Sequence, residues 1–86
     1  MTGDFLLAAL ADARQRRDQA SYEIRLLLAY AREVTQPRPY RLADLAQATG
    51  MSISGVRTAY SAADVETVTA LLAAHRAEGE HGSPAA

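Results

Sequence analysis

The side chains best suited to recognition chemistry lie between positions 38 and 58, and they are arginines and small hydroxyl-bearing residues. Arg57 carries a planar guanidinium whose paired N–H groups can bind two acceptors at once, such as two phosphate oxygens or O6 and N7 of guanine. The full set of candidate contact residues is Arg57, Ser54, Thr58, Ser52, Ile53, Arg41 and Arg38. The alternative for each is a solvated side chain on an exposed surface. Recognition is favoured over that alternative for Arg57, the two are evenly balanced for Ser54 and Thr58, and Ser52 suits a helix cap better than a contact.

Residues for catalysis or metal binding are scarce. The only histidines, His75 and His81, are six positions apart and therefore do not share a helix face as a metal-binding pair would. The chain has no cysteine, which excludes thiolate metal sites and disulfides. There is neither a plausible Ser/His/Asp constellation nor a glycine-rich loop after a strand. We expect no enzymatic activity, no cofactor and no metal.

Two short helices, expected over 42–49 and 52–60, must position the candidate contacts. The apolar positions of the first have the i, i+3, i+4, i+7 spacing of one helical face, and they are Leu42, Leu45, Ala46 and Thr49. Gly50 should end this helix in the left-handed conformation, Ser52 should cap the next one, and Val56 should face the shared core.

With Ala46 where the two helices cross, Gly50 in the turn and Val56 facing inward, the stretch 42–61 resembles the helix-turn-helix motif of bacterial and phage repressors. A long Arg/Ala-rich helix ahead of such a motif is similar to many small regulators of GC-rich bacteria. The resemblance covers about a quarter of the chain. It departs from the motif at Arg41, where a Ser, Thr or Asp cap is common.

The resemblance implies an all-α protein that binds double-stranded DNA sequence-specifically, with helix 52–60 in the major groove and its first side chains at the base edges. Transcriptional regulation, or partition or excision on a plasmid or phage, would be the role. The resemblance also implies that Arg38 and Arg41 would contact phosphates. The alternative is a helix–glycine–helix corner in a protein–protein interaction module, such as an adaptor, an antitoxin or a sigma-like accessory subunit.

One long helix is expected over 4–34, because this stretch has no proline or glycine and its apolar residues recur at spacings of four and three. A break near 18–21, with Ser21 as cap, is the alternative. The stripe consists of Leu6, Leu10, Ala13, Arg17, Ala20, Ile24, Leu27, Ala31 and Val34, and Arg17 is its one charged member. The residues expected to pack beneath the helix pair are Ile24, Leu27, Leu28 and Ala31.

The N-terminal end of that helix carries Phe5, Leu6 and Leu10, whose exposure to water is costly when they lack a partner. We expect this end to pair with a second copy, giving a homodimer, or with the C-terminal helix. Folding back onto its own domain is the other possibility.

The remaining chain contains a linker, a last helix and a tail. Two prolines make 35–40 a break in helical structure. Ser61 and Asp64 resemble a capping box that begins a helix over 62–77, and the polar segment 79–86 is expected to be disordered.

A length of 86 residues suits one domain, which is expected over 1–78, and the net charge of the chain is −1. The low net charge weighs against nucleic-acid binding, but residues 1–61 hold eight of the nine basic residues against six acids, and every basic residue is arginine. No apolar run reaches the ~18 residues of a membrane span, and no secretion signal is visible. A cytoplasmic location without membrane contact is therefore expected.

Overall fold

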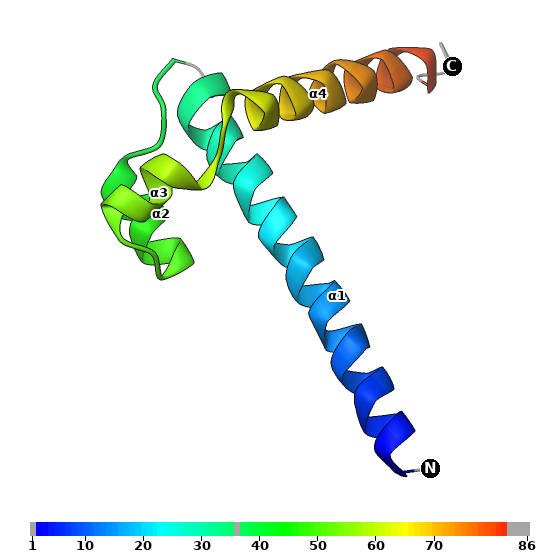
Figure 1. Ribbon diagram of the computed structural model, residues 1–86. Coiled ribbons are helices and arrows are strands. Elements are labelled where there is room, and N and C mark those ends of the chain that lie inside the picture. Colours follow the sequence, from blue (N-terminus) through cyan, green and yellow to red (C-terminus); the bar gives the residue numbers. More distant parts are fainter. Residues whose placement is uncertain (1, 36, 83–86) are drawn as a thin grey trace.

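The computed structural model describes residues 2–35 and 37–82, with side chains for 4–35 and 37–78. Its elements are the α-helix α1 (Thr2–Ala29), the π-helical turn η1 (Tyr30–Val34), and the α-helices α2 (Leu42–Thr49), α3 (Ile53–Ala59) and α4 (Ala62–Gly82). The described residues contain no strand. The expected all-α fold with a long N-terminal helix is confirmed (Figure 1).

Helix α1 runs unbroken through 18–21 and ends in one wider turn. The Thr35 N–H donates to the carbonyl of Tyr30 at 3.0 Å, and the Thr35 hydroxyl donates to the carbonyls of Ala31 at 2.6 Å and Tyr30 at 3.1 Å. These bonds satisfy carbonyls at the end of the helix. The prolines downstream cannot do so, because proline has no N–H to donate. The chain leaves the helix at Thr35, whose ψ is 136°.

The core lies where α4 crosses the C-terminal end of α1. Leu26, Ala29 and Val68 are buried against one another, with Val34, Tyr60 and Val65 packed around them. Figure 1 shows the other end of α1, drawn in blue, projecting alone and away from the remaining helices. The molecule is correspondingly extended, with principal dimensions of 56 × 41 × 21 Å.

The expected packing face of α1 is partly wrong. Leu28 and Ala31 are buried as expected, but Leu27 is 65% exposed and Ile24 is 38% exposed. Successive residues lie about 100° apart around a helix, so Leu26 and Leu28 flank Leu27 on its two sides. Because α4 packs against Leu26 and α2 lies beside Leu28, the apolar stripe between them stays uncovered.

Helices α2 and α3 are joined by a tight turn with the expected local structure. Gly50 has φ +74°, and an added Cβ would meet no atom within 4 Å, so the backbone conformation alone requires glycine. The Ser52 hydroxyl accepts the Gly55 N–H at 2.9 Å and thereby caps α3. Val56 is fully buried, as expected.

At the start of α4, the Asp64 carboxylate accepts the Ser61 N–H at 3.0 Å. The helix continues to Gly82, beyond the expected end at 77, because Gly79 alone costs only about 1 kcal/mol in a helix and its neighbours are good helix formers. Residues 79–82, expected to be disordered, are thus helical here, while 83–86 lie outside the described residues. Within the described chain, no helix has both the length and the apolar character that crossing a membrane requires.

Candidate functional site

Helix α3 has one buried side and one side open to solvent. Val56 faces the core with no exposed surface. The five sequence-predicted residues of this helix and its cap are all exposed, and they are Ser52, Ile53, Ser54, Arg57 and Thr58. Ile53, at 45% exposure, is a large apolar side chain presented to water at the first position of the helix. The fold therefore brings these predicted residues together on one short element.

Local hydrogen bonds already engage two of the hydroxyls. Ser52 is occupied as the cap of α3, and the Thr58 hydroxyl donates to the backbone carbonyls of Ser54 at 3.1 Å and Gly55 at 3.3 Å. Both oxygens keep acceptor capacity, whereas the Thr58 proton is directed back into its own helix. A Cβ on Gly55 would lie 3.1 Å from the Ser52 hydroxyl, so the cap itself explains the glycine without any external ligand.

Arg57 lies at the rim of an open hollow of about 640 Å³ formed with residues of η1 and α4. Its lining consists of Glu33, Arg57, Tyr60, Ser61, Ala62, Val65 and Glu66. Glu33 and Glu66 bring two carboxylates to this hollow, but no described acidic residue comes within 4.0 Å of the Arg57 guanidinium. The guanidinium is therefore available to an external acceptor.

Tyr60 donates its hydroxyl to Oε1 of Glu33 at 3.3 Å and so links the end of α3 to η1. Burial is the largest influence raising the pKa of the Tyr60 phenol above its usual value of 10.0, and the negative charge of Glu33 raises it further. The phenol is thus neutral at physiological pH. Sequence reasoning missed this contact because the two residues are 27 positions apart and follow no common periodicity.

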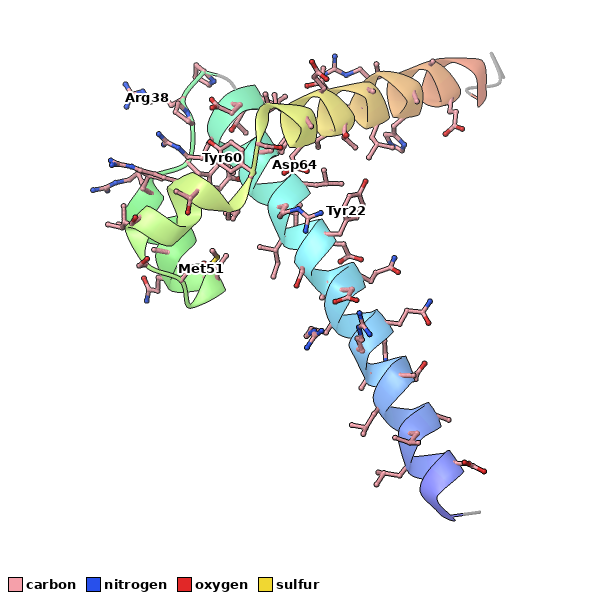
Figure 2. The ribbon with its side chains drawn as sticks, viewed as in Figure 1. Tyr22, Arg38, Met51, Tyr60 and Asp64 are labelled. Atoms are coloured by element: carbon pink, nitrogen blue, oxygen red, sulfur yellow. The ribbon has the colours of Figure 1, made fainter. Side chains whose placement is uncertain are left out.

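Arg38 and Arg41 lie on the linker, which is held by bonds to η1. The Tyr40 N–H donates to the carbonyl of Ala31 at 2.9 Å, and Nη1 of Arg32 donates to the carbonyl of Tyr40 at 2.7 Å. Figure 2 shows Arg38 on the same side of the molecule as α2 and α3, away from the free end of α1. The linker thereby presents its cations beside the helix pair.

Arg41 precedes α2 as its cap residue, and its side chain forms no cap hydrogen bond. Its carbonyl instead accepts the N–H groups of Asp44 and Leu45, each at 3.1 Å. The position therefore lacks the side-chain cap that a Ser, Thr or Asp would supply. Arg38 and Arg41 are both exposed, and no acidic side chain in the described residues pairs with either.

The arginines of α1 are engaged differently. Arg16 lies 3.0 Å from Asp12, Arg14 lies 3.8 Å from Asp18, and Arg25 lies 3.8 Å from Asp64. These pairs make the polar side of α1 a mixed-charge surface. Positions 37–61, by contrast, hold three arginines and one acidic residue, Asp44, so local charge there is positive although the whole chain carries −1.

In the described part of the chain, no three or more acidic or histidine side chains are placed to hold a metal ion. Comparisons with protein-family models, with curated proteins and with solved structures find no match to this chain.

Proposed function

We propose that the chain is a bacterial, cytoplasmic protein that binds double-stranded DNA sequence-specifically and acts in transcriptional regulation or in plasmid or phage partition or excision. The observation that carries the proposal is the two-sided character of α3, whose Val56 is buried while Arg57 is exposed and unpaired among the described residues. A short helix fixed on one side and presenting an uncommitted guanidinium on the other suits insertion into the major groove.

In this proposal Arg57 reads a guanine through O6 and N7, which is worth roughly 1–3 kcal/mol of discrimination against another base. Ser54 has an uncommitted hydroxyl for a base or phosphate, whereas Thr58 offers mainly its oxygen lone pairs. Ile53 can contact a thymine methyl group. Arg38 and Arg41 contact phosphates, which adds affinity without sequence preference.

Selection of duplexes from a random-sequence pool at ~150 mM salt tests the proposal, because non-specific phosphate contacts are weakened there. Enrichment of a motif containing guanine is expected. Arg57→Ala should then lose preference for that guanine while keeping its helical circular dichroism. Arg76→Ala, which removes an exposed arginine from α4, is the matched control and should leave the motif unchanged. Equal behaviour of the two variants would refute the assignment of Arg57.

The linker arginines give an independent test. Each lost phosphate contact should reduce the slope of log affinity against log salt by about 0.9. Arg38→Ala and Arg41→Ala should therefore weaken binding to all sequences alike and flatten the salt dependence. A change in base preference by either variant would contradict their role as phosphate contacts.

A second candidate function, a helical protein-interaction module, is favoured by the exposed apolar end of α1. Phe5 is 77% exposed, Leu6 is 60% exposed and Leu10 is 58% exposed. This function predicts salt-tolerant capture of a partner protein that Leu6→Ser or Leu10→Ser abolishes and Arg57→Ala leaves intact. DNA binding instead predicts no such capture, and a loss of base preference in Arg57→Ala.

A further inference from the structure

The apolar stripe of α1 is exposed along almost its whole length. Every described side chain from Asp4 to Ile24 is exposed, and Figure 1 shows this part of the helix with no other element beside it. Isolated helices are marginal in water, and most helix stability in proteins comes from packing of an apolar face. Within the described residues, the chain supplies no such packing for this segment.

The stripe leads directly into two apolar hollows on either side of Leu27. One, of about 400 Å³, is lined by Glu23, Leu26, Leu27, Tyr30, Val68 and Leu72. The other, of about 350 Å³, is lined by Ile24, Leu27, Leu28, Leu45, Ala48 and Thr49. Leu27 stands between them and is 65% exposed. The C-terminal end of α1 is therefore a receiving surface that a second apolar helix would fill.

We propose that two copies of this chain pair through α1 in antiparallel orientation, with Leu10 of each copy opposite Leu27 of the other. Spacings of four and three make the stripe a heptad seam, which favours pairing of two helices along their length. Placing Leu10 opposite Leu27 fixes the register of the two helices. The numbers of any two facing residues then add to 37, as 10 and 27 do. The facing pairs within α1 are Leu10 with Leu27, Ala13 with Ile24, and Arg17 with Ala20.

In this register small side chains face larger ones, and the apolar N-terminal end of α1 lies at the partner's two hollows. Ala13 faces the larger Ile24, and Arg17 faces Ala20, whose small side chain leaves the guanidinium room to reach solvent. Leu7 approaches the hollow beside the partner's Leu28. The two most exposed apolar regions of α1 thus cover each other.

Charge favours the same register. Arg16 and Glu23 lie on the same flank of the seam, seven positions apart, and antiparallel pairing places Arg16 of one copy beside the partner's Glu23. Two-fold symmetry repeats this contact, giving two opposite-charge pairs. Parallel pairing in register would instead set Arg17 against the partner's Arg17 in the seam, where like charges repel.

The pairing would also set the spacing between the two α2–α3 helix pairs on DNA. This consequence rests on the proposed DNA binding, whereas the pairing of the two chains does not. Leu28 lies next to α2. In the antiparallel register it lies level with residue 9 of the partner chain. The two copies of Leu28 are therefore 19 residues, or about 28 Å, apart along the helix pair. The two copies of α2, which lies next to Leu28, are then related by a two-fold axis, and their offset along the helix pair is of the same order as the ~34 Å of one DNA turn.

Charge reversal in the full chain tests the pairing without DNA. Arg16→Glu alone creates two Glu–Glu contacts in the homodimer, and Glu23→Arg alone creates two Arg–Arg contacts. In sedimentation equilibrium, each variant should have a dimer dissociation constant about tenfold weaker than the unchanged chain. An equimolar mixture of the two should recover the affinity, since both contacts of the mixed dimer then join opposite charges.

Recovery in the mixture separates contact between copies from a role within one copy. Arg16 also binds Asp12 in its own helix at 3.0 Å, and loss of that bond cannot be restored by a second chain. A chain that remains monomeric at all concentrations would overturn the proposal. Dimerisation that neither variant weakens, or that the mixture does not restore, would also overturn it.

Disulfide trapping tests the orientation, and the absence of cysteine from the chain makes the experiment clean. Chains carrying Ala13→Cys should cross-link to chains carrying Ile24→Cys, because these positions face each other in the antiparallel register. Ala13→Cys chains cross-linking among themselves would show parallel pairing, and no cross-linking would place the contact elsewhere. Either result would refute the arrangement.

Discussion

Asp64 connects the beginning of α4 to α1, and Asp64→Ala should lower the free energy of unfolding by about 2 kcal/mol. Its carboxylate accepts the Ser61 N–H at 3.0 Å, and loss of such a capping bond typically costs about 1 kcal/mol. A negative charge in the first helical turn contributes roughly 0.3–1 kcal/mol through the helix dipole. The pair with Arg25, at 3.8 Å, adds at most about 0.5 kcal/mol because the Arg25 side chain is 42% exposed.

Urea unfolding followed by far-ultraviolet circular dichroism measures this loss, at one fixed protein concentration because pairing of chains would add to the apparent stability. Arg25→Ala removes the ion pair but keeps the cap, so it should cost about 0.5 kcal/mol plus the contact of its guanidinium with the Tyr22 ring. Glu66→Ala is the control, since it removes an exposed carboxylate from the same helix and should change stability by less than about 0.5 kcal/mol. If Asp64→Ala costs no more than Arg25→Ala, the capping contact does not stabilise α4 and the reasoning fails.

Three further predictions test the fold. Gly50→Ala should cost about 1–2 kcal/mol in urea unfolding, because φ is +74° and no clash contributes; an unchanged midpoint would contradict the left-handed turn. Leu28→Ala should cost about 2–5 kcal/mol, whereas the matched Leu27→Ala should change monomer stability by under about 0.5 kcal/mol and weaken only dimerisation. Tyr60 should ionise above pH 10.0 in phenolate absorbance, and Glu33→Gln should lower that pKa without removing the effect of burial. Because the pKa of Tyr60 is raised in the folded state, the neutral phenol contributes its full stabilisation below pH 10, and this stabilisation is lost as pH rises through the folded-state pKa. A Tyr60→Phe variant that loses as much stability at alkaline pH as the unchanged chain would refute this.

The features that sequence predicted well depend on residues a few positions apart. Gly50 adopts the expected left-handed conformation, Ser52 caps α3, and Asp64 binds the Ser61 N–H. A cap is decided by a side chain and a backbone group within one helical turn, so composition and spacing contain nearly all the required information. The prolines after Thr35 mark the end of the long helix for the same reason.

Features that join distant segments were not predictable in this way. The Glu33–Tyr60 contact and the bond from Arg32 to the Tyr40 carbonyl arise from how η1, the linker and α3 meet. Neither has a periodic signature, and each involves side chains that would otherwise be ordinary surface residues. The hollow at Arg57 follows from the same arrangement, which is why its two carboxylates were not anticipated.

The incorrect placement of Leu27 has a more general cause. A stripe with spacings of four and three specifies that one helical face is apolar, but it does not specify whether the covering helix belongs to the same chain. Here α4 and α2 lie to either side of the stripe, leaving Leu27 exposed and Leu28 buried. The pattern that indicated an internal packing face fits the proposed seam between two copies.

The proposed pairing also addresses the weakest point of the DNA-binding proposal, which is charge. Among the described residues, one copy presents Arg38, Arg41 and Arg57 as unpaired cations near the helix pair, and the whole chain carries −1. With phosphate contacts from only the two linker arginines, the electrostatic gain per copy is small. Pairing doubles these contacts on one duplex, and the second copy binds at the high effective concentration set by the first. If both proposals hold, pairing through α1 would give a chain of low net charge a hold on DNA that one copy alone would lack.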